Sequence, residues 1–279
     1  CGLGLDHINE IMIDHEFHIN SKSYKILHIS SCFPRKGVDV LLKSYSNVFN
    51  KRDDVSLIIK TFDNPHNNIE LLVNKHKENN SNFPDVKIIK DDLSFGQLKS
   101  LYLQSNVLVA PSRGEGFGLP IAEAMLLGLP VITTAWGGQR DFCNQNNSWL
   151  IDFKFAHANS HFDLDYSCWA EPSSQDLSDK IKTVYSATET ELSTKIDNAK
   201  ETTNLLRWDK VASEHKIFVK DLASNKDNKY SKVGWLSTWF SRCGIASYSR
   251  HLIDNMIEEV EVFHPYHEIT SNNDFDFAY

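Results

Sequence analysis

The sequence predicts an α/β fold with a doubly wound parallel sheet. Short apolar runs alternate along residues 24–134 with segments that repeat apolar side chains at helical spacing. Glycine and proline separate several of these segments. Strands that alternate with helices build parallel sheets covered by helices on both faces. The 279 residues suffice for one large domain or two smaller ones, with a sizeable apolar core.

The first part of the chain is expected to contain five buried strands, at residues 24–30, 55–60, 86–89, 107–110 and 131–134. Helices are expected between them, at residues 37–49, 69–77 and 98–104, and from Pro120 to the stop signals Gly128 and Pro130. Ligands of parallel sheets bind beyond the carboxyl ends of the strands. The segments that follow the strands should therefore meet at one edge; they are residues 30–36, 60–64, 90–94 and 111–119.

The later part of the chain is less regular. Its expected elements are, in order, a polar loop at 144–161, a capping box at 173–176 before a helix through Ile181 and Val184, a helical region at about 189–222, a linker at 223–231, a strand at 232–238, a loop at 239–244 and an amphipathic helix at 245–257. Periodicity alone also allows the segment after the linker to be an appendage of the main domain.

Composition excludes several classes of function. Lys and Arg total 29 against 37 Asp and Glu, a net charge of −8, and this balance argues against a nucleic-acid-binding surface. No apolar run approaches the length of a membrane span, and the first residues have no signal-peptide pattern. The five cysteines lack a Cys-x-x-Cys pair and predict free thiols in a reducing cytoplasm. His15 and His18 lack the spacing of a helical metal pair, and no metal is expected.

The most informative segment is residues 112–125 (SRGEGFGLPIAEAM), a glycine loop between a strand and a helix. Backbone N–H groups at a helix start suit phosphate. Glu115 and Glu123 would repel phosphate, but their carboxylates accept hydrogen bonds well from hydroxyl groups. A ligand with both phosphate and many hydroxyls fits this combination, and a nucleotide sugar has both.

Other glycine-rich loops fit this segment less well. A dinucleotide fingerprint would need glycine at Leu119 or at Ile121, and no Walker loop ending in Gly-Lys-Ser or Gly-Lys-Thr occurs in the chain. For the loop alone, a tight strand-to-helix turn with a solvated glutamate stays an alternative.

Glu115 and Glu123, with seven residues between them, resemble the motif of retaining glycosyltransferase family 4, a GT-B family. Residues 31–42 (SCFPRKGVDVLL) resemble that family's phosphate-binding segment, and residues 101–102, 106–107, 110–112 and 128–132 are similar to the usual surroundings of the motif. The resemblance covers about residues 24–222 and keeps the order of the motifs. It implies the C-terminal, Rossmann-like half of a GT-B fold.

The resemblance implies a role for the cations at the first loop. Lys36 would contact the donor diphosphate and stabilise the leaving group, with Arg35 as a second donor-binding residue or a merely exposed one. The family often has an arginine six residues before this lysine, where this chain has Ser30. One phosphate contact is therefore missing or supplied differently.

The resemblance also implies roles around the glycine loop. Glu115 would be the catalytic residue at the sugar ring, either as nucleophile or, as we prefer, as a positioning group beside a leaving phosphate that guides attack on the same face. Glu123 would bind the ribose, and Ile89 would border the base. The backbone of Gly116, Phe117, Gly118 and Leu119 would cradle sugar and phosphate. Residues 136–138 border the acceptor cleft or form a plain turn, and no cofactor is needed.

The resemblance implies four parts of the chain. Residues 1–23 would be an interdomain crossover, 24–222 the nucleotide-sugar-binding domain, 223–231 a linker, and 232–279 the incomplete start of a further glycosyltransferase N-terminal domain. Residues 239–246 (WFSRCGIA) resemble the opening of such a domain in multidomain bacterial mannosyltransferases. The chain is therefore expected to be part of a longer polypeptide and inactive in transfer by itself.

The function expected from these features is a retaining glycosyltransferase. It would move a sugar, mannose from GDP-mannose by resemblance, to a glycan or lipid-linked acceptor in polysaccharide or O-antigen synthesis. Its place would be the cytoplasm, at the inner face of the membrane. The alternatives are a nucleotide-sugar-binding or scaffolding module without transfer activity and a sugar-nucleotide epimerase. Lys36, Glu115 and Glu123 together favour the transferase.

Overall fold

The computed structural model describes residues 2–160, 166–224, 232–236, 244–256 and 259–263. The chain divides into two compact units, each described here by itself. The larger unit comprises residues 15–91 and 100–203, and the smaller one comprises residues 1–14, 92–99 and 204–279.

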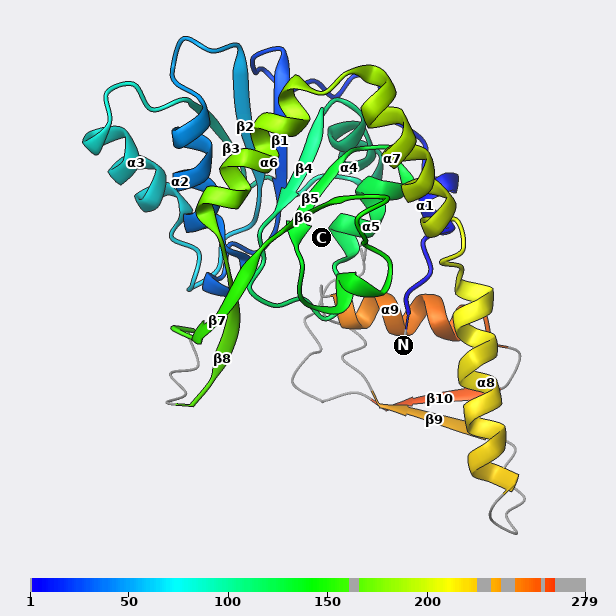
Figure 1. The fold of residues 1–279 in the computed structure, drawn as a ribbon. Helices are drawn as coiled ribbons and strands as arrows, with labels where there is room; N and C mark the ends of the chain where they lie inside the picture. The colour runs from blue at the N-terminus through cyan, green and yellow to red at the C-terminus, as the bar shows by residue number, and fades with distance from the viewer. Residues whose placement is uncertain (1, 161–165, 225–231, 237–243, 257–258, 264–279) are drawn as a thin grey trace. The chain divides into compact units, whose positions relative to one another are not determined.

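A six-stranded parallel sheet forms the centre of the larger unit (Figure 1). Its strands are β1 (Tyr24–Ile29), β2 (Val55–Lys60), β3 (Asp85–Ile89), β4 (Val107–Ala110), β5 (Val131–Thr134) and β6 (Trp149–Ile151). They lie in the order β3-β2-β1-β4-β5-β6, and every neighbouring pair is parallel. The chain reverses its direction of winding between β1 and β4. The predicted doubly wound α/β fold is thereby confirmed.

Helices cover the sheet. They are α2 (Val38–Val48), α3 (Ile69–Asn79), α5 (Leu119–Leu126), α6 (Ser174–Ser186) and α7 (Glu189–Thr203). A further helix, α4 (Phe95–Leu103), has residues in both units. One apolar core joins α2, α3 and α6 to the sheet, with Leu41, Leu57 and Ile181 among its buried members. The Tyr45 hydroxyl donates to the carbonyl oxygens of Val55 and Asp85, at 3.1 and 2.8 Å, and so attaches α2 to the starts of β2 and β3.

Each of the five predicted strands is present, with ends within one residue of the prediction. The loop predicted at 144–161 is wrong, because that segment contains β6 and β7 (Phe153–His157). β7 pairs antiparallel with β8 (Cys168–Pro172) in a separate hairpin. β6 has only three residues, too few to show a period, and β7 packs Phe153 and Phe155 against Trp136 instead of filling the main core.

The predicted cap at α6 is confirmed in one half. Ser173 Oγ accepts from the backbone N–H of Asp176 at 3.2 Å. In a complete box the Asp176 carboxylate would accept from Ser173 N. Here it accepts instead from the backbone N–H of Asp152 at 2.8 Å, while Ser173 N donates to the Asp152 carbonyl oxygen at 2.8 Å. The cap therefore also attaches α6 to the chain just after β6.

The helical region predicted at 189–222 is two helices, because α7 ends at Thr203 and α8 runs over Trp208–Ser224. Within the smaller unit, Asp6 Oδ1 accepts from the backbone N–H of Trp208 at 2.8 Å, and Leu5 N donates to the Leu206 carbonyl oxygen. These contacts fix the start of α8 and the turn before it. The residues that make these contacts lie about two hundred positions earlier in the chain. Helical periodicity within 189–222 therefore gives no sign of the break.

The smaller unit also contains α1 (His7–Glu10), α9 (Gly244–Asp254) and the parallel pair β9 (Lys232–Leu236) and β10 (Glu259–Phe263). The strand expected at 232–238 is thus present over its described residues 232–236, while 237 and 238 lie outside the described residues. The helix expected at 245–257 is present as α9, which begins at Gly244 and ends at Asp254. Residues 239–243 of the expected loop and 225–231 of the expected linker lie outside the described residues, while 223 and 224 belong to α8. The four-part division of the chain stays a prediction.

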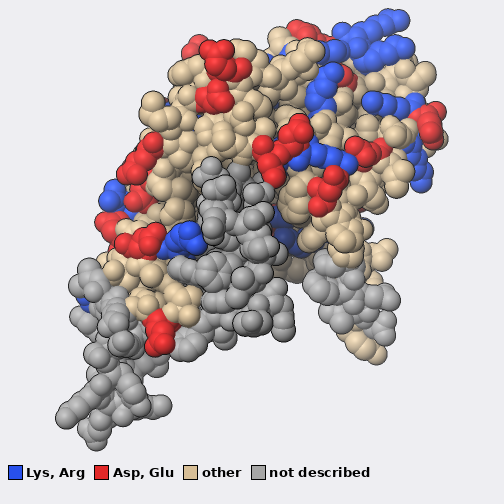
Figure 2. All heavy atoms as spheres, turned by 180° about the vertical axis from the view of Figure 1, so that it is seen from behind, with Lys and Arg blue, Asp and Glu red and all other residues tan. Residues whose placement is uncertain are grey.

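Two surface properties bear on partners. Among the residues that the structure describes, no helix has the length and apolar character needed to cross a bilayer. Acidic and basic side chains both occur across the face drawn in Figure 2. The described residues of this face form no purely basic patch of the kind that binds nucleic acid, in keeping with the net charge of −8.

Candidate functional site

The loops after β1 and β4 lie side by side at the carboxyl edge of the sheet. β1 pairs with β4, so the segment after Ile29 emerges next to the segment after Ala110. Gly37 has φ +68°, and a Cβ there would lie 2.0 Å from the Pro111 carbonyl oxygen. Only glycine adopts this conformation at this distance without strain. The predicted meeting of residues 30–36 with 111–119 is confirmed.

Residues of the two other predicted segments, 60–64 and 90–94, are linked to this edge as well. The Asn64 side chain donates to the Ser31 carbonyl oxygen at 2.9 Å, which joins the segment after β2 to the segment after β1. Lys90 Nζ, just after β3, lies 2.9 Å from Asp63 Oδ1. The residues that follow three neighbouring strands are thus linked to one another.

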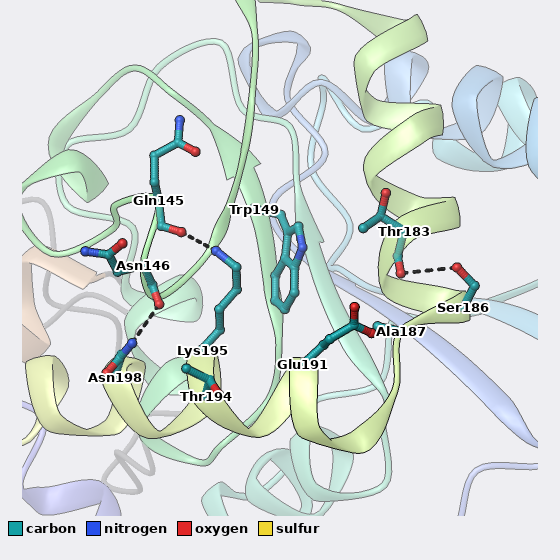
Figure 3. A pocket seen from close by; sticks show the side chains of 10 residues that line it. All are labelled: Gln145, Asn146, Trp149, Thr183, Ser186, Ala187, Glu191, Thr194, Lys195 and Asn198. Atoms are coloured by element: carbon teal, nitrogen blue, oxygen red, sulfur yellow. Dashed lines mark hydrogen bonds between the residues drawn. The ribbon is translucent and has the colours of Figure 1, made fainter.

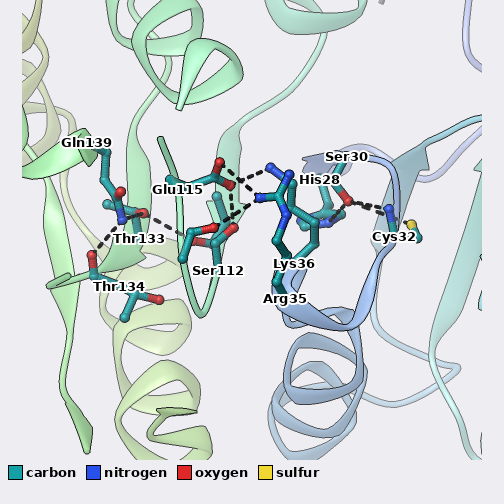
Figure 4. A network of polar contacts seen from close by, with 12 residues as sticks. His28, Ser30, Cys32, Arg35, Lys36, Ser112, Glu115, Thr133, Thr134 and Gln139 are labelled. Carbon is teal, nitrogen blue, oxygen red and sulfur yellow. Dashed lines mark hydrogen bonds and ion pairs between the residues drawn. The ribbon is translucent and has the colours of Figure 1, made fainter. Parts of the chain in front are cut away.

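An ion pair occupies the centre of this edge (Figure 4). Lys36 Nζ lies 2.6 Å from Glu115 Oε1, and the Ser112 hydroxyl donates to the same oxygen at 2.7 Å. The Lys36 and Glu115 side chains are only 12% and 10% exposed. Arg35 Nη1 donates to the Gly114 carbonyl oxygen at 3.0 Å and lies 3.6 Å from Glu115 Oε2. The predicted residues Arg35, Lys36 and Glu115 are therefore together.

The surroundings favour the charged form of Glu115 and work against the charge of Lys36. Burial works against ionisation of Glu115, but the Lys36 ammonium, the Ser112 hydroxyl and Arg35 outweigh it and lower the pKa of Glu115. Burial lowers the pKa of Lys36, and the Glu115 carboxylate partly offsets that effect. A carboxylate held in this way is a hydrogen-bond acceptor. The ammonium beside it can attract a further anion.

His28, in β1, is a buried and neutral side chain. Its Nδ1 lies 2.8 Å from the Val109 carbonyl oxygen, which can only accept, so Nδ1 carries the proton and Nε2 accepts from the Ser30 hydroxyl at 2.8 Å. Burial is the main cause that lowers the pKa of His28 to about 4. Ser30 Oγ also accepts from Cys32 N at 3.0 Å. Ser30, which stands where the resembled family often has arginine, is thus engaged in the turn after β1.

The glycine loop leads into α5 as predicted. Gly118 precedes α5 with φ +91°, and Pro120 lies in the first turn. A Cβ at Gly116 would meet no atom within 4 Å, whereas one at Gly138 would lie 1.8 Å from the Gly116 carbonyl oxygen. One side of the loop is thus open, and the other is pressed against residues 137–138, where Gly138 N donates to the Glu115 carbonyl oxygen at 2.9 Å.

The remaining predicted residues surround this loop at different depths. Phe117 packs on Phe142 with ring centroids 5.0 Å apart, and Leu119 is the first residue of α5. Glu123 is buried within α5, where its Oε2 accepts from the Tyr102 hydroxyl at 2.7 Å. Ile89 is the last residue of β3, separated from β1 by β2, and it is not brought to the Lys36–Glu115 pair. Tyr102 was not among the predicted site residues.

Sequence reasoning also missed Arg113, a buried arginine inside the glycine segment. It is bound to Asp39 in α2 and to Glu171 in β8. Glu171 lies 58 residues further along the chain. The sequence shows that Arg113 stands inside the glycine segment, between Ser112 and Gly114. It does not show that β8 folds back to this loop and brings Glu171 to Arg113.

A cavity of about 650 Å³ lies elsewhere in the larger unit (Figure 3). α6, α7 and the residues before β6 form it, and Trp149, Glu191 and Lys195 are among its lining residues. Trp149 begins β6, so the cavity is at the amino end of that strand. The predicted site residues follow the carboxyl ends of β1 and β4. This cavity is therefore separate from the Lys36–Glu115 pair.

The candidate site is built from cations, a carboxylate, hydroxyls and backbone groups. In the described part of the chain, no three His, Cys, Asp or Glu side chains gather as a metal ion would require. A phosphate at this edge could be bound by Lys36, Arg35 and the backbone N–H groups that precede α5.

Comparison with known proteins places this arrangement in context. The model of a family described as glycosyl transferases group 1 matches residues 11–164. An uncharacterized glycosyltransferase of Methanocaldococcus jannaschii is 28% identical over 127 residues, 45% of this chain and 33% of that protein. The capsular polysaccharide biosynthesis glycosyltransferase CapM of Staphylococcus aureus is 28% identical over 130 residues, 46% of this chain and 33% of that protein. The matched region is about a third of the length of these relatives.

Solved structures share the fold. Sucrose-phosphate synthase from Thermosynechococcus elongatus has a TM-score of 0.60 at 18% identity, over 81% of this chain and 52% of that one. HepE from Anabaena, in complex with UDP and glucose, has a TM-score of 0.54 at 19% identity, over 73% and 49%. The C-terminal domain of LpcC, a glycosyl transferase group 1 family protein from Francisella tularensis, has a TM-score of 0.51 at 20% identity, over 66% and 86%.

Proposed function

This chain belongs to the glycosyl transferases group 1 family, and from that membership we propose that it binds the donor of a retaining glycosyltransferase. The donor is a nucleoside-diphosphate sugar, held at the carboxyl edge of the sheet. The observation that carries the proposal is the buried Lys36–Glu115 pair beside an open glycine loop. It unites a cation for phosphate with a carboxylate for sugar hydroxyls. The sheet would then be the C-terminal half of a GT-B fold.

Lys36 binds the diphosphate and stabilises the charge that develops on it as the leaving group departs. Its ammonium is nearly buried, so its attraction for an anion is screened less than that of a surface lysine. Arg35, which is 43% exposed and beside the same carboxylate, adds a second contact with the donor. The backbone of Gly116, Phe117, Gly118 and Leu119 lies against sugar and phosphate, with open space beside Gly116.

Glu115 orients the sugar ring at the reacting carbon. Its Oε1 already accepts from Lys36 and from Ser112, which fixes the direction of the carboxylate. Neutralisation by Lys36 also weakens Glu115 as a nucleophile, and this supports positioning as its role. Retention of configuration then follows from attack on the face that the leaving phosphate occupies. The phosphate guides and deprotonates the acceptor hydroxyl as the bond to the sugar breaks.

Glu123 binds the ribose hydroxyls, with Tyr102 fixing one of its oxygens at 2.7 Å. Ile89, at the end of β3, borders the base. Two different parts of the donor are thus bound by two different carboxylates. Glu115 serves the transferred sugar, and Glu123 serves the nucleotide.

The wider assignment extends the proposal to the whole protein. Its acceptor is a glycan or a lipid-linked glycan of polysaccharide or O-antigen synthesis, in keeping with the name of the relative CapM. GDP-mannose is the proposed donor and mannose the transferred sugar. This rests on the resemblance of residues 239–246 to multidomain bacterial mannosyltransferases, and residues 239–243 lie outside the described residues. The proposed place is the cytoplasm at the inner membrane face. Free thiols at Cys32, Cys143 and Cys168 support a reducing compartment.

Two other functions fit the same fold. A scaffolding module would bind the nucleotide sugar without transferring it, and a sugar-nucleotide epimerase would act on the donor alone. The charged, oriented state of Glu115 favours transfer over scaffolding, because a module that only binds has no need of a buried carboxylate at the sugar. An epimerase would convert the donor without an acceptor, which an assay distinguishes.

The test is a calorimetric titration of the chain with UDP, GDP and ADP and with their sugars. At least one diphosphate should bind, and the matching nucleotide sugar should bind through both Lys36 and Glu123. If no diphosphate binds at millimolar concentration, the proposed function is wrong. The control is Lys43→Ala, since Lys43 is an exposed lysine on α2. Its titration should match that of the unmodified chain.

A further inference from the structure

Arg113 uses every hydrogen-bond donor of its guanidinium. Nε donates to Glu171 at 2.6 Å, Nη1 to the Pro34 carbonyl oxygen at 2.6 Å and to Asp39 at 2.8 Å, and Nη2 to Asp39 at 2.7 Å and to Glu171 at 2.8 Å. A guanidinium has five N–H donors, and all five are occupied here. The side chain is 6% exposed, and its guanidinium carbon also lies 4.6 Å from the centroid of the Trp169 ring.

These contacts join the two loops that carry the candidate site. The Pro34 carbonyl and Asp39 lie on either side of Lys36 in the sequence, so Arg113 fixes the segment at both ends. The backbone adds a third contact, from Arg113 N to the Arg35 carbonyl oxygen at 2.7 Å. Arg113 itself lies two residues before Glu115. The guanidinium thus connects the segment that bears the ammonium to the segment that bears the carboxylate.

The same side chain attaches the β7–β8 hairpin to the site. Glu171 forms a two-point contact with the guanidinium, Ala170 N donates to the Arg113 carbonyl oxygen at 3.2 Å, and Trp169 stacks on the cation. Burial works against the charge of Arg113, but the hydrogen bonds that it donates to Glu171 and Asp39 raise its pKa. A planar fork that bridges two carboxylates has no equivalent in lysine, which is a point charge with three donors.

We propose that Arg113 is a positioning residue for the donor-phosphate site. Arg113 sets Lys36 opposite Glu115 and does not itself touch the donor. This proposal rests on the proposed function, in which Lys36 binds the diphosphate. Because no donor of Arg113 is left for a phosphate, its effect on the ligand passes through Lys36. Replacement by lysine keeps a positive charge but cannot bridge Asp39, Glu171 and the Pro34 carbonyl together. The Lys36 ammonium then loses its fixed place.

The first test needs no nucleotide. The pKa of Glu115 is measured by carbon-13 NMR of its carboxyl group in the unmodified chain, in Arg113→Lys and in Lys36→Ala. Both variants should raise the pKa of Glu115, because each removes the ammonium from its position. The control is Arg52→Lys, at an exposed arginine in the turn after α2, which should leave that pKa unchanged. An unchanged value in Arg113→Lys would overturn the positioning role.

The second test measures binding of the preferred nucleoside diphosphate and of the nucleoside that lacks phosphate. Arg113→Lys should weaken the diphosphate at least tenfold and change the nucleoside less than twofold. In a Lys36→Ala background the same replacement should change diphosphate affinity less than twofold. Equal losses for both ligands, or a full loss in the Lys36→Ala background, would mean that Arg113 only supports the fold. If the unmodified chain binds no diphosphate, the proposed function fails while the NMR result still decides the role of Arg113.

A milder variant guards against failure to fold. Glu171→Gln keeps the shape of the side chain and removes one of the two carboxylates that bridge the guanidinium. It should shift the Glu115 pKa and the diphosphate affinity in the same direction as Arg113→Lys, by a smaller factor. No shift of either quantity in a folded Glu171→Gln protein would contradict the connection from β8 through Arg113 to the site.

Discussion

Lys36 Nζ and Glu115 Oε1 lie 2.6 Å apart although Glu115 is 79 positions further along the chain. The contact exists because β1 and β4 are neighbours in the sheet and their loops emerge at the same edge. It joins the cation and the catalytic carboxylate proposed for the donor into a single unit. Substitutions in this pair and in the residues around it should therefore change donor binding, turnover or stability.

Glu115 and Glu123 should affect different steps. In a protein with measurable sugar transfer, Glu115→Gln should leave nucleotide affinity within about threefold and lower turnover about a hundredfold or more, since it removes a contact made to the reacting sugar. Glu123→Gln should instead raise the dissociation constant of the donor, and Tyr102→Phe should do so more weakly, because it only frees one oxygen of Glu123. Steady-state kinetics and calorimetry check both. Equal effects on binding from the two glutamine variants would contradict this division.

Two glycines of the site should respond differently to alanine. Gly37→Ala should destabilise the fold by at least about 2 kcal/mol, since φ is +68° and the new Cβ meets the Pro111 carbonyl oxygen. Gly116→Ala should keep the free energy of unfolding within about 0.5 kcal/mol, because its Cβ enters open space. It should nevertheless weaken binding of the nucleotide sugar. Denaturation and titration together distinguish the two cases, and unchanged binding in Gly116→Ala would argue against a ligand on the open side of the loop.

Much of the fold could be predicted from the sequence because its central strands include continuous apolar runs, such as β4, in which every residue is apolar and buried. The meeting of Lys36 with Glu115 followed from strand adjacency. The break before Trp208 could not be predicted from helical periodicity, since the Asp6 carboxylate that accepts from the Trp208 N–H lies about two hundred residues earlier in the chain. Nor could the contact of Arg113 with Glu171, which depends on where the β7–β8 hairpin folds back. Contacts between segments that are distant in the sequence leave no periodic pattern in it.

His28 should make the stability of the larger unit depend on pH. Burial lowers its pKa to about 4 from 6.5, so the unfolded chain binds more protons between these values and the free energy of unfolding rises with pH in that window. The contribution is fully present above pH 6.5 and is lost as pH falls toward 4, by up to about 3 kcal/mol. His28→Asn should therefore flatten this dependence.

Urea denaturation of the unmodified chain and of His28→Asn, at intervals from pH 4.5 to 7.5, measures that slope. His7, whose pKa burial also lowers to about 4, is present in both proteins, so its share cancels in the comparison. Parallel curves for the two proteins would mean that His28 takes up its proton in the folded state as readily as in the unfolded one.

The most direct measurement is a calorimetric titration of the unmodified chain and of Lys36→Ala with the nucleoside diphosphate that binds best. The account predicts a loss of about 1.5 to 3 kcal/mol of binding free energy in a folded variant, the size of a charge-assisted hydrogen bond. Affinity for the nucleoside without phosphate should stay the same. Unchanged affinity for the diphosphate in folded Lys36→Ala would contradict the assignment of the Lys36–Glu115 pair to the donor.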